Sequence, residues 1–205
     1  GGRNNDITGS NFAVIGGGYN NLIDDSQYGF IGGGALNEVQ QGSDGGAIIG
    51  GYGNRIKPLS TYSILGGGRG NTLSGRYNVM VGGLQNTVSG WYSASLGGNH
   101  SVISGDNSAI LGGEYNYVSG NAAVAMGNYS NVQQGHDGAF VFSDSVITPV
   151  YSTGADTMVL KFKSGVFIDG DSGLYINSAN GIHINGNPVM TGVSDTDVDT
   201  LQSVT

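Results

Sequence analysis

Carboxylate side chains are the first groups in this sequence that could perform chemistry. Hydrolysis of a glycosidic bond needs two carboxyl groups held about 5 to 9.5 Å apart. Six acidic residues of the repeat region are the candidates, and they are scattered apart from one adjacent pair in an expected turn: Asp24, Asp25, Glu38, Asp44, Asp106 and Glu114. Separate subunits could still bring two of them together. One chain alone presents no pair that predicts a glycosidase, and we predict no catalytic residue.

The segment DGDSG at residues 169–173 offers two further kinds of chemistry. GDSG is the sequence around the reactive serine of chymotrypsin-like proteases, but that fold also needs a His and an Asp placed by two β-barrels. A calcium-binding EF-hand loop counted from Asp169 needs Glu at its twelfth position, where this chain has Asn180. A solvated turn explains the segment better than either site, so we predict no metal and no cofactor.

His183 is the one histidine whose position could gather metal ligands. A threefold axis along its column would bring three imidazoles together, and imidazole suits several transition metals. A packed or solvated side chain is the more common role for such a residue. His100 and His136 have no partner motif. The histidines therefore do not change the expectation that the chain lacks a metal site.

Aromatic residues form the pattern most suggestive of binding. Tyrosine recurs at one position of the repeat described below: Tyr28, Tyr62, Tyr77 and Tyr92. Arg76 and Trp91 immediately precede two of them. Such rings stabilise neighbouring strands when they pack in a ladder, and they also suit contacts with sugars and proteins. Both interpretations stay open, and the candidate receptor-contact surface consists of Trp91, Tyr92, Tyr77, Arg76 and Tyr62.

The composition indicates an ordered, repetitive backbone behind these side chains. The 205 residues include 40 Gly, 3 Pro and no Cys, with 38% hydrophobic and 11% charged residues. Collagen would need Gly at every third position with much Pro, and disorder would bring fewer apolar and more charged residues. Glycine must therefore mark recurring turns of a folded chain.

The charge balance excludes one class of partner. Seven Lys and Arg against 15 Asp and Glu give a net charge of −8, whereas binding to a nucleic-acid backbone requires clustered basic residues. No run of 18 apolar residues occurs, so we expect no membrane insertion. The chain begins inside a repeat and ends at TLQSVT, and we expect it to be a piece of a longer protein.

A repeat of 15 to 18 residues organises most of the sequence. Aligning the Gly pairs gives nine copies that begin at Gly1, Gly16, Gly32, Gly50, Gly66, Gly82, Gly97, Gly112 and Gly127. This period is too short for a helical hairpin and suits one turn of a β-solenoid. The sequence therefore predicts an all-β fold, a parallel β-roll of about nine coils.

Each coil is expected to contain two strands of different character. The first strand ends at a large apolar residue directly before the Gly pair: Ile15, Ile31, Ile49, Leu65, Val81, Leu96, Leu111 and Met126. The two preceding positions are also mostly apolar, so both faces of this strand should be buried. The second strand keeps one apolar column among polar neighbours: Ile7, Ile23, Val39, Ile56, Leu73, Val88, Ile103, Val118 and Val132.

This asymmetry predicts an obligate oligomer. A two-stranded coil buries one face of each strand against the other and leaves the back of the first strand bare, so another copy of the chain must cover it. Before the second strand stands a column of asparagines, with Ser101 in one place, which predicts a buried Asn ladder: Asn5, Asn21, Asn37, Asn54, Asn71, Asn86, Asn116 and Asn131.

The repeat resembles a known family of surface proteins. NSAILGGEYNYVSG at residues 107–120 and NAAVAMGNYSNVQQG at residues 121–135 are similar to the head repeats of trimeric autotransporter adhesins, the YadA-like β-roll. The resemblance covers residues 1–142 and implies a left-handed roll in a homotrimer, with the first strand toward the threefold axis. The frequent GGG and the variable period resemble more closely the same module in phage tail fibres.

The remaining residues divide into three expected segments. Residues 143–164 break the repeat and are expected to form a cap and connector. Residues 165–192 hold three octads, GVFIDGDS, GLYINSAN and GIHINGNP, which predict a short intertwined trimeric β-prism. GIHINGNPVMTG resembles a segment common in phage tail fibres. Residues 193–205 are expected to be a linker toward a downstream domain.

These features favour a structural and adhesive role over an enzymatic one. We expect a homotrimeric module of a virion tail fibre, a receptor-binding protein or rigid spacer that acts outside the cell on a host cell-surface glycan or protein receptor. The first alternative is the head domain of a bacterial trimeric autotransporter adhesin on a bacterial cell surface. The second is a glycan-depolymerising tailspike.

Overall fold

The computed structural model describes residues 1–144, 148–166, 182–184 and 187–190. The chain divides into two compact units, Gly1–Val166 and Phe167–Thr205. The octads and the linker fall mostly outside the described residues, and so does the prediction of a β-prism. Within the second unit, strand β21 (Ile182–Ile184) pairs antiparallel with β22 (Asn187–Met190).

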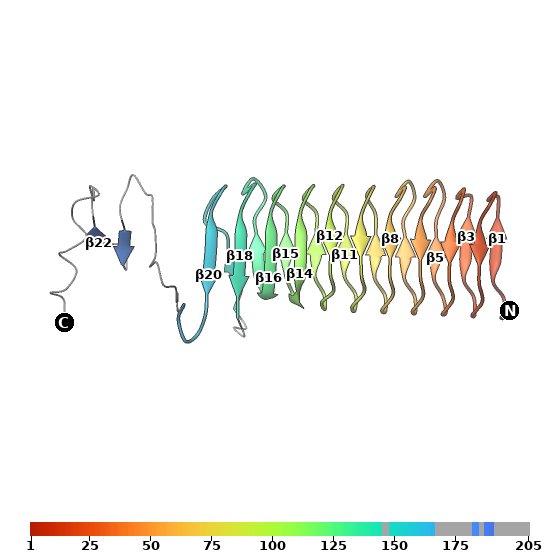
Figure 1. Cartoon of the computed structure of the whole chain (residues 1–205), viewed down its shortest axis with the longest axis horizontal. Helices are drawn as coiled ribbons and strands as arrows, with labels where there is room; N and C mark the ends of the chain where they lie inside the picture. Colours follow the sequence, from red (N-terminus) through yellow and green to blue (C-terminus); the bar gives the residue numbers. More distant parts are fainter. Residues whose placement is uncertain (145–147, 167–181, 185–186, 191–205) are drawn as a thin grey trace, which may run out of the picture. The chain divides into compact units, whose positions relative to one another are not determined.

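The first unit consists of two sheets, and successive strands along the chain belong to one sheet and then the other (Figure 1). We call them the odd sheet and the even sheet after the numbers of their strands. The odd sheet has ten strands: β1 (Asp6–Thr8), β3 (Leu22–Asp24), β5 (Glu38–Val39), β7 (Arg55–Ile56), β9 (Thr72–Leu73), β11 (Thr87–Val88), β13 (Val102–Ile103), β15 (Tyr117–Val118), β17 (Ser130–Val132) and β19 (Val150–Tyr151). The even sheet has ten: β2 (Val14–Ile15), β4 (Phe30–Ile31), β6 (Ala47–Ile48), β8 (Ile64–Leu65), β10 (Val79–Met80), β12 (Ala94–Ser95), β14 (Ala109–Glu114), β16 (Val124–Asn128), β18 (Phe140–Ser143) and β20 (Met158–Lys161).

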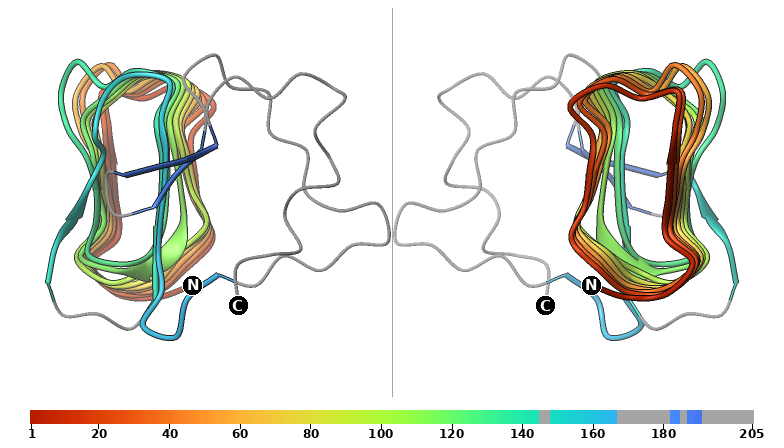
Figure 2. Two further views of the ribbon diagram at one scale, coloured as in Figure 1. Left: turned by 90° about the vertical axis from the view of Figure 1, so that its left-hand side faces the viewer. Right: turned by 90° about the vertical axis from the view of Figure 1, so that its right-hand side faces the viewer.

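The alternation confirms the predicted all-β parallel β-solenoid. Every strand of the first unit pairs in parallel with the strand two places along the chain, so each coil lies on the one before it. Seen along the roll, the coils superimpose into a rectangular outline with the two sheets as its long sides (Figure 2). Two strands and two corners therefore make one coil.

The roll has one coil more than the nine that the Gly pairs mark. Residues 143–164, expected to be a cap and connector, contain β19 and β20, which pair with β17 and β18. The sequence hides this tenth coil because Phe142 stands where a tenth Gly would fall. The segment thus extends both sheets, and β20 is the last strand of the even sheet.

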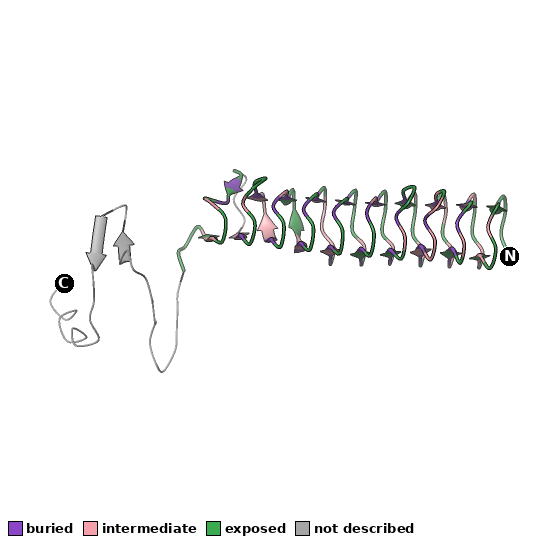
Figure 3. Cartoon of the chain, turned by 90° about the horizontal axis from the view of Figure 1, so that it is seen from above, coloured by how far each residue is buried: buried purple, intermediate pink, exposed green. Residues whose placement is uncertain are grey.

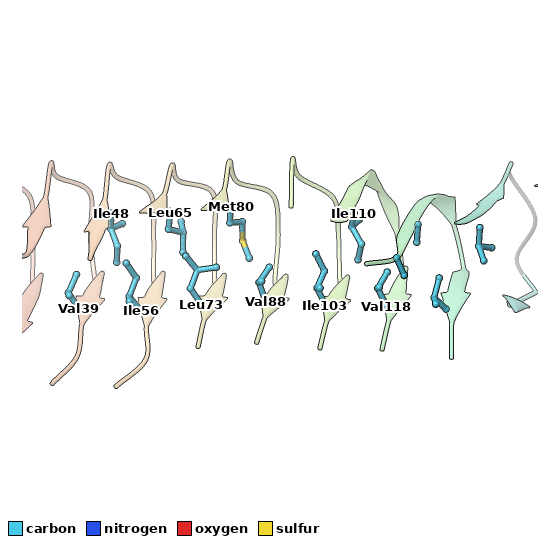
Figure 4. Close-up of a cluster of buried hydrophobic side chains, with 14 of the residues drawn as sticks. Val39, Ile48, Ile56, Leu65, Leu73, Met80, Val88, Ile103, Ile110 and Val118 are labelled. Carbon is cyan, nitrogen blue, oxygen red and sulfur yellow. The ribbon is translucent and has the colours of Figure 1, made fainter. Parts of the chain in front are cut away.

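The core consists of two rows of apolar side chains that meet inside the roll (Figure 4). From the odd sheet come the residues of the predicted second-strand column, of which Ile23, Leu73 and Val118 are fully buried. From the even sheet come Ile48 and Met80, also fully buried. One coil alone encloses almost no apolar volume, so stability depends on stacking, as in other solenoids.

The column directly before the Gly pairs does not lie on one face, and this part of the alignment is wrong. Ile31 and Leu65 are fully buried, whereas Ile49 is 54% and Val81 56% exposed. The paired strands show why, because Ile31 lies beside Ile48 rather than Ile49. In coils with three consecutive glycines, the first Gly occupies the outward-facing position of the strand. In coils with two glycines, an apolar residue such as Ile49 or Val81 occupies that position. Buried and exposed segments then recur in step along the roll (Figure 3).

The predicted Asn ladder is present and lies inside the roll. Asn71 is fully buried, and its amide nitrogen donates hydrogen bonds to the carbonyl oxygens of Gly67 at 3.0 Å and Gly83 at 2.9 Å. Its Oδ1 accepts the backbone N–H of Asn86 at 2.9 Å. Each ladder asparagine thereby holds a corner of its own coil and the next coil in place.

One predicted member of the ladder is misplaced by one residue. The side chain of Asn116 accepts the backbone N–H of Ser130 at 2.9 Å, so Ser130 continues the ladder. Asn131 lies beside Tyr117 on the outward side of β17. This coil is shorter by one residue than a strict 15-residue repeat at this corner, which explains the displaced column.

Glycine is required where coils approach most closely. Gly68 and Gly83 have φ of +83° and +103°, in the region that side chains rarely adopt. A Cβ atom at Gly68 would collide with the carbonyl oxygen of Gly83 in the next coil. The second or third Gly of each group therefore allows the coils to stack at this corner.

Candidate functional site

The predicted tyrosine column forms a stacked ladder at one corner of the roll. The ring centroids of Tyr62 and Tyr77 lie 5.6 Å apart with 15° between the rings, and those of Tyr77 and Tyr92 lie 4.9 Å apart with 3° between them. All three residues have φ between +55° and +59°. This corner is where the chain passes from the odd sheet into the even sheet, and we call it the tyrosine corner.

The ladder begins in the first coils and has one interruption. Phe12 and Tyr28 stack at 5.3 Å, and Gly45 takes the place of a ring before Tyr62. Tyr77, with a ring on each side, is 45% exposed, whereas Tyr62 at the end of its stack is 61% exposed. Stacking covers ring faces, so the ladder presents mainly ring edges and hydroxyl groups to its surroundings.

Arg76 and Trp91 extend the tyrosine corner on its outer side. The guanidinium carbon of Arg76 lies 5.6 Å from the ring centroid of Trp91, a cation–π distance. The backbone N–H of Trp91 donates to Oδ1 of Asp106 at 2.7 Å. Trp91 is 49% exposed. The structure therefore brings together all five residues of the predicted receptor-contact surface, on three successive coils.

The tyrosine corner borders a surface of exposed apolar side chains. Tyr77 precedes the outward Val79 by two residues, and Tyr62 precedes the outward Ile64 in the same way. We call the outward surface of the even sheet the apolar face: Val14, Phe30, Ile49, Ile64, Val79, Val81, Leu96, Leu111, Met158 and Leu160. A molecule that covers the apolar face would therefore also approach the tyrosines.

A second aromatic stack lies at the opposite corner, and its tyrosines belong to a group that follows the Gly pairs in the sequence. His100, Tyr115 and Tyr129 stack with centroid separations of 5.2 and 5.1 Å. Nδ1 of His100 lies 2.7 Å from Oδ1 of Asn99. The three stacked residues share one position, two residues after the glycine of positive φ in each coil. We call this place, where the even sheet leads into the odd sheet, the histidine corner.

The acidic residues engage in contacts that hold coils together. Oε2 of Glu38 lies 2.7 Å from Nε of Arg55 on the outward side of the odd sheet. Asp44 accepts the backbone N–H of Gln27 at 2.7 Å, as Asp106 does from Trp91. Within the described residues, no group of three or more His, Asp or Glu side chains is placed to hold a metal ion.

No protein-family model matches the chain, and no curated protein matches it. In the part of the chain that the structure describes, no helix is long and apolar enough to cross a membrane.

Proposed function

We propose that this chain is a structural and adhesive module of an extended appendage such as a phage tail fibre. It forms a homotrimer, holds a rigid β-roll outside the cell, and binds a host cell-surface glycan or protein without making or breaking a bond. The observation that carries the proposal is the difference between the two outward sides of the roll. The even sheet presents the apolar face, whereas the odd sheet presents a mainly polar surface.

The contrast between the two outward surfaces supports self-association. Residues of the apolar face are between 38% and 66% exposed in the single chain. The odd sheet instead turns mainly polar residues outward, such as Glu38, Arg55 and Thr72, with Tyr117 as an exposed aromatic exception. A long contiguous apolar surface is uncommon on monomeric proteins and marks an interaction site. Because the surface repeats in nearly every coil, an identical repeating partner matches it best.

The tyrosine corner supports the adhesive part of the proposal. Trp91 and Arg76 project from the roll beside the Tyr ladder, and the neighbouring coil carries Asp106 in the same column. An indole with a cation on one face and a carboxylate nearby can contact both the apolar and the hydroxyl surfaces of a sugar or protein. The backbone of Trp91 is held by the stacking of its coil on the next one, and this favours a rigid binding surface.

Replacing Trp91 with alanine should weaken binding to host cells about tenfold or more, as truncation of a central interface aromatic does. Binding of the labelled chain to host cells measures the effect. Tyr117→Ala is the matched control, because Tyr117 is 48% exposed on the outward side of the odd sheet. If both variants bind host cells equally well, Trp91 does not contact the receptor, and the tyrosine corner serves only to pack the coils.

A second assay separates adhesion from glycan cleavage. The chain is incubated with host surface polysaccharide, and new reducing ends are measured. We expect none, because the proposed action is binding alone. Their release would contradict the non-enzymatic proposal and direct attention to carboxylates paired between subunits.

A further inference from the structure

A shallow hollow lies at the histidine corner, on the three coils that directly precede His100. Its lining comes from three successive coils: Tyr52, Gly53, Arg69, Gly70, Leu84 and Gln85. Parallel bridges join Tyr52 to Arg69 and Arg69 to Leu84, so these three residues stand in one column. The hollow is therefore part of the regular roll, held by its backbone pairing.

Two glycines create the hollow by interrupting a row of side chains. Gly53 and Gly70 have φ of +64° and +66°, and the same place in neighbouring coils holds Leu36, Gln85 and His100 at +58°, +55° and +53°. A Cβ atom at Gly53 would meet no atom within 4 Å. The space that a side chain fills in other coils is thus open in these two.

One cationic side chain lines the hollow, on the middle one of its three coils. The guanidinium carbon of Arg69 lies 5.5 Å from the ring centroid of Tyr52. Arg69 is exposed, and it forms no salt bridge within the described residues, in contrast to Arg55. None of the lining residues is acidic. In a chain of net charge −8, an arginine without a carboxylate partner is available to an anion.

We propose that this hollow binds a carboxylate-bearing sugar unit of a surface glycan, an assignment that rests on the proposed adhesive function. The planar guanidinium matches a carboxylate with two parallel hydrogen bonds. Leu84 offers an apolar contact to the sugar ring, and the amide of Gln85 offers hydrogen bonds to hydroxyl groups. The net negative charge of the chain opposes general anion attraction, so binding depends on Arg69.

Saturation-transfer NMR on the 205-residue chain tests the proposal directly. The probes are galacturonic acid oligomers and N-acetylneuraminic acid, with galactose oligomers as the neutral comparison. We expect binding of the acidic sugars and none of the neutral ones. Arg69→Gln should weaken binding about tenfold or more, because it removes a charge-assisted bidentate contact. Arg55→Gln, which removes the same charge from a guanidinium engaged with Glu38, should leave it unchanged.

A second variant tests the shape of the hollow. Gly53→Gln places a side chain in the open space, in a backbone conformation that Gln85 adopts at the corresponding position. We expect it to abolish acidic-sugar binding while the chain stays folded, with the thermal unfolding temperature lowered by only a few degrees because a side chain is strained at this φ. Unchanged binding in this variant would show that the sugar lies elsewhere and would overturn the assignment.

Three further outcomes would also overturn it: equal binding of neutral and acidic sugars, equal effects of the two arginine variants, or competition by inorganic phosphate as strong as by the acidic sugar. The last would indicate a general anion site. Host-cell binding measured in parallel separates the two proposals. If the unmodified chain binds host cells but no acidic sugar, the assignment of the hollow is refuted and the adhesive function stands. If the unmodified chain does not bind host cells at all, the adhesive function is refuted.

Discussion

Asn71→Leu is expected to lower the free energy of unfolding by about 4 kcal/mol. The leucine leaves the carbonyl oxygen of Gly67 and the backbone N–H of Asn86 without a hydrogen-bond partner. It also removes one of the two hydrogen bonds to the carbonyl oxygen of Gly83, which keeps the one from a backbone N–H. A buried polar group without a hydrogen bond costs roughly 1–3 kcal/mol. Urea unfolding followed by circular dichroism, at one protein concentration for all variants, measures the change.

Asn131→Ala is the matched control for this prediction. Asn131 belongs to the same residue type and lies next to the ladder, but its side chain points outward from β17 and is only half-buried. Its replacement should change the free energy of unfolding by about 0.5 kcal/mol or less. Equal losses from the two substitutions would contradict the conclusion that the Asn ladder holds successive coils together.

Leu96→Glu is expected to convert the proposed trimer into monomers at micromolar concentration. Leu96 lies on the apolar face and is 54% exposed in the single chain. In a symmetric trimer the substitution places three carboxylates in the interface, and each buried unpaired charge costs several kcal/mol. Light scattering coupled to size-exclusion chromatography measures the mass of the variant.

Thr87→Glu separates this effect from that of added charge. Thr87 lies on β11, on the outward side of the odd sheet, where the surface is polar. The same change in net charge there should leave the mass of the particle unaltered. If Leu96→Glu also keeps the mass of the unmodified chain, the apolar face is not the contact between subunits.

The core of the odd sheet is predictable from sequence because its pattern has a single interpretation. Residues such as Leu73 and Val88 are flanked by polar residues, so their alternation identifies the inward face. The Asn column adds a second, independent marker of the same register. The structure confirms both, apart from the one-residue shift that places Ser130 in the ladder.

The register of the even sheet is not predictable in this way. GG and GGG coils both place an apolar residue directly before glycine, but Leu65 points inward and Val81 points outward. Apolar residues occupy both faces of this sheet, so hydrophobicity cannot distinguish them. Only the hydrogen-bonded pairing of Leu65 with Met80 establishes the register.

The surface sites are predictable only where the sequence shows which residues of successive coils lie side by side. The tyrosine corner is identified because Tyr62, Tyr77 and Tyr92 follow one another at a spacing of 15 residues, which needs no decision about inserted residues. The hollow around Arg69 lies where the coils are longer and the Gly alignment is offset. Its recognition needs the bridge between Tyr52 and Arg69, which the sequence alone does not give.

The mass of the unmodified chain in solution tests the central claim most directly. The proposed trimer has three times the chain mass of 20.9 kDa, or 3 × 20.9 = 62.7 kDa, and light scattering at micromolar concentration should report this value. That result would mean that the exposed apolar face of the single chain is covered by identical copies. A mass of 20.9 kDa would contradict the account, because the apolar face would then remain in contact with water.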